Sequence, residues 1–157
     1  MKVWRICRAR HAVDPLSGKG GLHASGRWHT KGRRVTYTSE SLALAALELL
    51  VHASPSELPA DLVRVEIEMP DDLPRERLDV PSLVRSVGRS WRDTPGPESL
   101  QAIGNEWLDS MRSAVLQVPS AVIPTERNAL LNPTHEDAHR IEVVSVEKFV
   151  LDPRLAR

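Results

Sequence analysis

"SGRWHTKGRRVTYTS", residues 25–39, is separated by one residue from "SLALAALELLVHA", residues 41–53, and these two stretches decide the fold. In "RVTYT", Val35 and Tyr37 alternate with polar neighbours, which predicts a strand over 34–38. The second stretch has the length and composition of a helix, and Ser39 or Ser41 can cap its N-terminus. A strand followed at once by an apolar helix predicts a domain that mixes both kinds of element.

Four further runs are expected to be extended. They are "VWRI" (3–6), "LVRVEIEM" (62–69), "AVLQVPSAVI" (114–123) and "IEVVSVEKFV" (141–150). The second alternates apolar and charged side chains, which predicts a half-solvated strand that is antiparallel or near a sheet edge. The third is interrupted by Pro119, and the last is either a closing strand pair or a single bent strand.

A second helix is predicted over residues 99–113. Its expected buried stripe consists of residues that recur at helical spacing, namely Leu100, Ile103, Trp107 and Met111. Seven of the chain's twelve prolines lie between Pro55 and Pro97, so this middle region is expected to be mostly turns and loops. With short strands at both ends, the pattern predicts one α+β domain over residues 1–157.

The composition argues against several classes of protein. Lysine plus arginine and aspartate plus glutamate number 21 each, and a net charge of zero argues against a dedicated nucleic-acid binder. Cys7 is the only cysteine, which excludes an intrachain disulfide and a thiolate zinc site. No segment approaches the ~18 apolar residues of a membrane span, and the N-terminus lacks the apolar run of a signal peptide. We therefore expect a cytoplasmic protein that contacts neither membranes nor nucleic acid directly.

Glu48 is the most informative single residue, because it stands in an otherwise apolar helix. Its neighbours three and four positions away are Leu44, Ala45, Val51 and His52. A buried carboxylate without a partner costs several kcal/mol of desolvation. Two interpretations stay open: this face points at solvent, or Glu48 lines a cleft and pairs with a cation or a ligand hydroxyl.

The preceding loop supplies candidate cations. Arg27, Lys31, Arg33 and Arg34 lie on or near a glycine-rich segment, where flexible backbone lets N–H groups converge on one anion. A charge run before a strand is also typical of a solvated loop. Because the chain has no surplus charge, this run is not expected to be a general basic patch, and the residues alone leave open whether it is a solvated loop or an anion site.

"HEDAH" (135–139) matches H-E-x-x-H, a pattern that binds zinc when both histidines share one helical face. Here it lies between "LNP" and a strand, with room for little more than one turn, and Thr134 and Asp137 look like a capping pair. No metal site is therefore expected. His52 is expected to be a packed or cap-proximal histidine, and Cys7 a small strand residue.

Three blocks in order resemble the RES-domain toxins of bacterial toxin–antitoxin pairs. They are "SGRWHTKGRRVTYTS", "SLALAALELLVH" and "VPSAVIPTERNALLNPTH" (118–135), and the resemblance spans nearly the whole chain. One departure is Trp28-His29, where many members have Phe-Asn.

The resemblance implies both a fold and a site. The fold is the split β-sheet of the ADP-ribosyltransferases with flanking helices, and the activity is consumption of NAD as substrate, with no metal. The family is named after an arginine, a glutamate and a serine, which match Arg27 (with Arg5 as a second candidate), Glu48 and Ser120. The implied catalytic residues are Arg27, Tyr37 and Glu48, and the implied NAD contacts come from Arg27, Tyr37, Ser120 and Asn132. With Arg27 taken as the anion ligand of its loop, Arg33 and Arg34 are expected to form a solvated pair.

The chemistry of these side chains suits cleavage of the nicotinamide–ribose bond. Loss of nicotinamide leaves an oxocarbenium-like ribose, which a carboxylate such as Glu48 stabilises. Arg27 would hold the pyrophosphate by electrostatic positioning. Tyr37 would stack on nicotinamide or bond a ribose hydroxyl.

Three hypotheses follow. The leading one is a toxin that degrades NAD by glycohydrolase or phosphorylase chemistry and arrests growth. The alternative is an ADP-ribosyltransferase that modifies a specific protein with the same residues, and the third is a non-enzymatic binding module with a solvated Glu48. The resemblance further implies an Xre-type antitoxin with a helix-turn-helix domain, through which any DNA contact would be made, and a homodimer.

Overall fold

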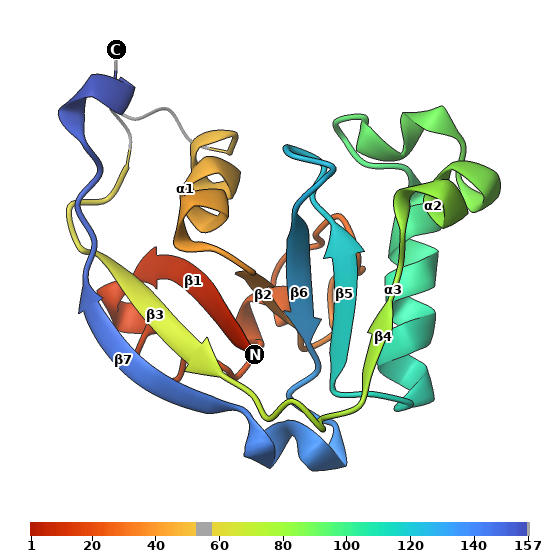
Figure 1. The fold of residues 1–157 in the computed structure, drawn as a ribbon, viewed down its shortest axis with the longest axis horizontal. Helices are drawn as coiled ribbons and strands as arrows, with labels where there is room; N and C mark the ends of the chain where they lie inside the picture. The colour runs from red at the N-terminus through yellow and green to blue at the C-terminus, as the bar shows by residue number, and fades with distance from the viewer. Residues whose placement is uncertain (53–57, 157) are drawn as a thin grey trace.

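The computed structural model describes residues 1–52 and 58–156. Within them, one mixed sheet has the strand order β4-β5-β6-β2-β1-β3-β7 (Figure 1). The strands are β1 (Lys2–Arg8), β2 (Thr36–Ser39), β3 (Leu62–Glu68), β4 (Arg75–Arg77), β5 (Val115–Pro119), β6 (Arg127–Leu131) and β7 (Glu142–Lys148). The flanking helices are α1 (Leu42–Leu50), α2 (Val80–Ser86) and α3 (Glu98–Ser110). The predicted α+β class is confirmed.

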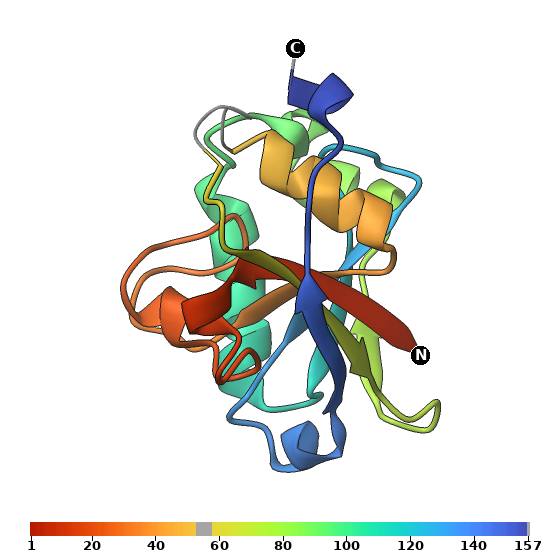
Figure 2. The same cartoon turned by 90° about the vertical axis from the view of Figure 1, so that its left-hand side faces the viewer.

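The sheet is split between β2 and β1. These strands share the single residue pair Trp4↔Ser39, whereas β1 and β3 are paired from Lys2↔Glu68 to Arg8↔Leu62. In Figure 1, β4, β5 and β6 stand side by side, and β1, β3 and β7 curve away from them. Figures 1 and 2 both show α1 above β1, at the end of the sheet where β5 ends and β6 begins. The expected split sheet is confirmed, and α1 lies next to the split.

The two stretches that decide the fold form β2 and α1. The hydroxyl of Ser41 accepts a hydrogen bond of 3.1 Å from the Leu44 N–H, so Ser41 rather than Ser39 caps α1. The helix ends at Leu50, and Ala53 of the predicted span lies outside the described residues. Leu44 is fully buried, which anchors this short helix on the sheet.

The second predicted helix is α3, and the prediction of its buried residues was wrong at one position. Leu100 and Trp107 are buried, but Met111 is 42% exposed. Met111 has a left-handed backbone with φ 54°, so it terminates the helix instead of extending the buried stripe. Leu108 is buried on α3 in its place.

The predicted strands are confirmed where the local sequence pattern is clear. The strand β3 is antiparallel to both β1 and β7, as its alternation predicts. The run at 141–150 forms one strand, β7, with a register irregularity opposite Glu66 and Ile67, so the single bent strand is the correct alternative. The elements β4, α2 and β6 were not predicted from the sequence. Of these, β6 pairs on both edges, with β5 and β2, and such long-range pairing leaves little trace in the local pattern.

Two apolar clusters stabilise the domain. One contains Val3, Val65, Ile67, Val115 and Leu131 and joins the two halves of the split sheet. The other packs sheet residues such as Leu116 and Leu130 against α3. No helix within residues 1–52 and 58–156 combines the length and hydropathy that a bilayer span requires.

Candidate functional site

The loop that carries Arg27 is held in place by α3. Gln101 Nε2 donates to the Gly26 carbonyl at 3.0 Å, and Asn105 Oδ1 accepts from the Thr30 N–H at 3.0 Å. Gly104 lets the helix approach so closely that a Cβ there would lie 1.8 Å from the Trp28 carbonyl oxygen. The position of Arg27 is therefore determined by a helix that is 75 residues later in the chain.

Arg27 is half-buried and turned toward the segment before α3. Its Nη1 donates to the Trp91 carbonyl at 2.9 Å. Burial lowers the pKa of Arg27, whereas the nearby carboxylates of Glu48 and Asp93 raise it. Its other N–H groups make no hydrogen bond to residues that the structure describes. The guanidinium thus has donors left for an anion and lies within electrostatic reach of Glu48.

Tyr37 projects from β2 against the Arg27 loop. Its hydroxyl accepts from the Trp28 N–H at 3.1 Å and lies 2.9 Å from His29 Nδ1. Burial raises the pKa of Tyr37 well above its usual value, although the Trp28 N–H and the charge of Arg27 oppose the shift. Tyr37 therefore stays neutral, and its hydroxyl is anchored in the loop.

Glu48 does not face solvent on an isolated helix surface: it is half-buried and bonded to the sheet. Its Oε1 accepts from Ser120 Oγ at 2.8 Å and from Asn128 Nδ2 at 2.6 Å. Ser120 is fully buried just after β5, where its Oγ also accepts from the N–H groups of Val122 and Ile123 at 3.0 Å each. Glu48 is therefore bonded within the fold and is not simply solvated, and the interpretation that it lines a cleft stays a prediction.

Asn128 belongs to this cluster, although the sequence did not single it out. It lies on β6 opposite Ser39 of β2, and Ser39 Oγ lies 2.7 Å from its Oδ1. An asparagine within a strand-like run is an unusual choice, because asparagine has a low preference for strands. That choice is the signal in "RNALL" that points to a special role.

Three other predicted residues lie elsewhere. Asn132 is fully buried at the opposite end of β6, about 13 Å along the strand from Asn128 at ~3.3 Å per residue, where it bonds the Leu108 carbonyl and Thr134. Arg5 on β1 donates to the Pro15 carbonyl. His52 is exposed just beyond the end of α1, so it is cap-proximal rather than packed. All three lie in the described part of the chain, and none of them forms a hydrogen bond with Glu48.

The expected solvated pair in the Arg27 loop was wrong. Arg33 and Arg34 are both half-buried. Arg33 forms an ion pair of 2.8 Å with Asp109 of α3, and Arg34 Nη1 donates to the Ser17 carbonyl at 3.1 Å. These contacts reinforce the attachment of the loop, and the choice of Arg27 as its anion ligand stays a prediction.

"HEDAH" forms the short 3-10 turn Glu136–Arg140, as the limited room predicts. The cap is His135 and not Thr134: its Nδ1 accepts from the Asp137 N–H at 3.0 Å, and its Nε2 lies 3.1 Å from the Met111 carbonyl. His139 is exposed and bonds the Glu136 carbonyl. Across residues 1–52 and 58–156, no group of three or more His, Cys, Asp or Glu side chains is placed to hold a metal ion.

Comparison with known proteins assigns the chain to a family. The family model described as "RES domain" matches residues 2–152. The chain belongs to the RES domain family. The "Prs ADP-ribosylating toxin" of Sphingobium sp. (strain YBL2) is 38% identical over 157 residues, which are 98% of this chain and 96% of that protein. A "Toxin Res" of Pseudomonas putida is 39% identical over 99% of both chains.

The fold of this RES domain also matches a solved structure. It superposes on a chain of the M. tuberculosis MbcT–MbcA toxin–antitoxin complex with a TM-score of 0.75 and 20% identity. The match covers 99% of this chain and 86% of the other. At this level of identity, the likeness supports the fold assignment.

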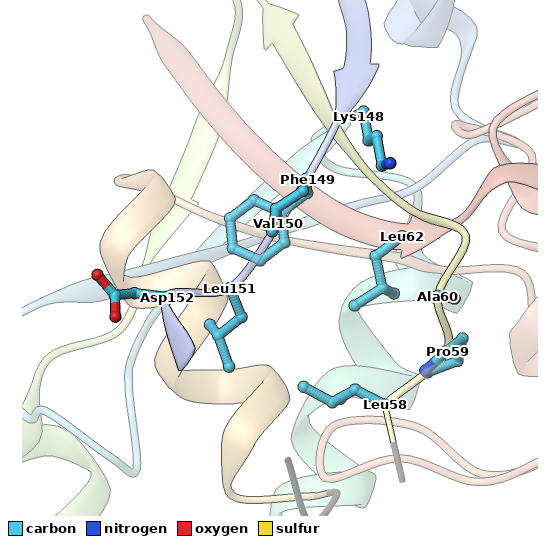
Figure 3. A pocket seen from close by; sticks show the side chains of 9 residues that line it. All are labelled: Leu58, Pro59, Ala60, Leu62, Lys148, Phe149, Val150, Leu151 and Asp152. Atoms are coloured by element: carbon cyan, nitrogen blue, oxygen red, sulfur yellow. The ribbon is translucent and has the colours of Figure 1, made fainter. Parts of the chain in front are cut away.

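Two hollows on the RES domain lie away from the Glu48 cluster. One of about 290 Å³ is lined mainly by apolar residues, and Figure 3 shows Leu58, Leu62 and Leu151 converging on it while the Asp152 carboxylate points away. The other, of about 420 Å³, includes Asn132 and His135. Neither is lined by Arg27, Tyr37 or Glu48. The candidate site is therefore identified by its group of hydrogen-bonded polar side chains and not by the volume of a hollow.

Proposed function

We propose that this RES domain is the toxin of a toxin–antitoxin pair and consumes NAD at the cluster of Arg27, Tyr37, Glu48 and Ser120. The observation that carries the proposal is a half-buried carboxylate held by two donors on one oxygen, with a guanidinium in electrostatic reach. A fixed negative charge beside a cation suits a substrate that combines a developing positive ribose with an anionic pyrophosphate.

In the proposed reaction, the bond between ribose C1′ and the nicotinamide nitrogen breaks, and its electron pair leaves with nicotinamide. The ribose becomes oxocarbenium-like, and Glu48 stabilises that charge. A nucleophile then donates an electron pair to C1′ and loses a proton. Arg27 holds the pyrophosphate, and the ring of Tyr37 packs against the substrate. Ser120 keeps Glu48 in place, so it contributes without touching the reacting bond.

Asn132 is left out of the proposed site. Its amide bonds the Leu108 carbonyl and the Thr134 hydroxyl and backbone, so its polar atoms already have partners. Arg5 is left out because its Nη1 is bonded to the Pro15 carbonyl, and no hydrogen bond among the described residues joins it to the Glu48 cluster.

Release of nicotinamide tests the proposal directly. Purified protein is incubated with NAD in water and in phosphate buffer, beside the variants Glu48→Gln and Glu40→Gln. Glu40 is a matched control, because it is an exposed glutamate near the start of α1 that bonds Gln117 and not the cluster. We expect Glu48→Gln to lower the rate at least about 100-fold, in line with the loss of an electrostatic catalytic group, and Glu40→Gln to leave it unchanged. Absence of release by the unaltered chain, or equal rates for Glu48→Gln, would contradict the proposal.

A second candidate is transfer of ADP-ribose to a protein, and the name of the Sphingobium relative favours it. Both reactions begin with the same bond cleavage and differ in the nucleophile. NAD labelled in the adenylate distinguishes them: label retained on a protein band indicates transfer, and label in free ADP-ribose or its phosphorylated form indicates degradation. Inducible expression in bacteria, with intracellular NAD measured over time, tests whether the activity operates in the cytoplasm.

The partner is proposed to be an Xre-type antitoxin that covers the site, and the toxin is proposed to be a homodimer. The match to a chain from a toxin–antitoxin complex supports an antitoxin. The net charge of zero is consistent with DNA contact through the partner alone. Co-expression with a candidate Xre-type antitoxin, followed by measurement of the mass of the complex, tests both expectations.

A further inference from the structure

We infer that Asn128, itself fixed by Ser39, is a positioning residue that orients Glu48 so that its Oε2 faces the substrate. The inference rests on the proposed function of Glu48. It concerns two side chains that do not reach the reacting atoms and act through the carboxylate.

Both hydrogen bonds to Glu48 end on the same oxygen. Ser120 and Asn128 donate to Oε1 at 2.8 and 2.6 Å, and Oε2 has no hydrogen-bond partner in the part of the chain that the structure describes. A single donor would let the carboxylate plane pivot about one contact. Two donors from separate strands, one after β5 and one on β6, fix that plane and leave Oε2 as the available oxygen.

The orientation of the Asn128 amide follows from the same network. An ionised carboxylate only accepts hydrogen bonds, so the group that faces Glu48 must be Nδ2. Oδ1 then faces the Ser39 hydroxyl at 2.7 Å, and that hydroxyl donates. Ser39 is only 4% exposed and pairs directly with Asn128 in the sheet, which holds the amide against rotation.

Ser39 is also the residue at which the two halves of the sheet meet. It pairs with Trp4 of β1 on one side and with Asn128 of β6 on the other. The hydrogen bonds from Ser39 to Asn128 and from Asn128 to Glu48 therefore connect the split in the sheet to α1. Asparagine has a low preference for strands, so a polar row at this place weakens the local tendency to form a strand. Such a departure is typical of a functional position rather than of a core position.

Steady-state kinetics of NAD consumption test the inference with the full chain. The variants are Asn128→Ala, Ser39→Ala, their double mutant, Glu48→Gln, and Thr38→Val as the matched control. Thr38 lies on β2 between Tyr37 and Ser39, and its buried hydroxyl donates to the Ala129 carbonyl of β6 at 2.7 Å without touching Glu48. Thr38→Val thus removes a comparable β2–β6 bond from the opposite face of the sheet.

We expect Asn128→Ala to lower kcat about 10- to 100-fold, as a small misplacement of a catalytic group does, with KM for NAD changed by less than about twofold. Ser39→Ala lowers kcat less, and the double mutant matches Asn128→Ala alone because Ser39 acts through Asn128. Thr38→Val lowers the unfolding temperature and leaves kcat unchanged. If Asn128→Ala does not fold, the near-isosteric Asn128→Asp serves instead: it sets two carboxylates against each other and lowers kcat at least as much.

The possible failures are distinguishable. If the unaltered chain consumes no NAD, or Glu48→Gln is equally active, the proposed function fails and this inference fails with it. If Glu48→Gln is inactive but Asn128→Ala and Asn128→Asp keep the full kcat, only the positioning role is overturned. It is also overturned if Thr38→Val lowers kcat as much as Asn128→Ala, or if the effects of Ser39→Ala and Asn128→Ala on kcat simply multiply in the double mutant.

Discussion

The hydroxyl of Tyr37 donates its only proton to His29. His29 Nε2 lies 3.1 Å from the Ala24 carbonyl, which can only accept, so Nε2 carries the imidazole hydrogen. His29 is 4% exposed, and burial lowers its pKa, so the ring is neutral and Nδ1 is an acceptor. The Tyr37 hydroxyl, 2.9 Å away, therefore donates to Nδ1 and accepts from the Trp28 N–H. Both roles expected for Tyr37 stay open: the ring can stack on nicotinamide, and a bond to a ribose hydroxyl would have to be accepted by the second lone pair of the Tyr37 oxygen.

Two substitutions of Tyr37 distinguish the contribution of its ring from that of its hydroxyl. We expect Tyr37→Phe to keep turnover of NAD within about threefold of the unaltered chain while it loses about 1–3 kcal/mol of unfolding free energy, because the Trp28 N–H loses its buried acceptor. Tyr37→Ala removes the ring and lowers kcat/KM at least about 100-fold, through lost packing and orientation. Nicotinamide release and urea unfolding measure the two effects. Equal loss of turnover in Tyr37→Phe and Tyr37→Ala would show that the hydroxyl acts in the reaction.

The neutral state of His29 predicts how stability depends on pH. Its folded pKa is lowered, chiefly by burial, below the unfolded value of about 6.5. Below that pH the unfolded chain binds a proton that the folded chain resists, so the free energy of unfolding declines as pH falls through about 6.5. His29→Asn removes the titration. Chemical unfolding between pH 7.5 and about 5.5, above the range where carboxylates titrate, is expected to show a shallower decline for His29→Asn than for the unaltered chain.

The sequence predicted those parts of the fold that have a local signature. Alternation marks β3, and the apolar run with a serine in front, interrupted only by Glu48, marks α1. By contrast, β6 is held by partners on both edges, and its own five residues mix charged, polar and apolar side chains. Because long-range pairing cannot be predicted from the local sequence, the sequence also could not show which asparagine of residues 118–135 belongs to the site. Asn128 lies within β6 and Asn132 one residue beyond its end, and only the hydrogen bond to Oε1 shows which of them is near Glu48.

The close approach of α3 to the Arg27 loop gives a test of how the loop is positioned. A Cβ on Gly104 would lie 1.8 Å from the Trp28 carbonyl oxygen and 2.8 Å from its carbonyl carbon, so Gly104→Ala must displace the loop or the helix. We expect a loss of about 1–3 kcal/mol of unfolding free energy, as for other overpacked sites, together with reduced NAD turnover. Gly20→Ala is the control, because nothing lies within 4 Å of a Cβ at that position. Unchanged stability and turnover in Gly104→Ala would mean that the helix does not fix this loop.

Substitution of Arg27 tests whether NAD binding depends on the geometry of the guanidinium or only on its positive charge. Arg27→Lys keeps the positive charge near Glu48, but it replaces a planar group of five donors, one of which bonds the Trp91 carbonyl, with a flexible ammonium. Because the remaining donors are proposed to bind the pyrophosphate, we expect KM for NAD to rise at least about tenfold with a smaller effect on kcat, the pattern of lost ground-state binding. Arg34→Lys is the matched control: Arg34 is also half-buried, and it donates to the Ser17 carbonyl outside the cluster. An unchanged KM in Arg27→Lys, or an equal rise in Arg34→Lys, would mean that the loop contributes only general positive charge.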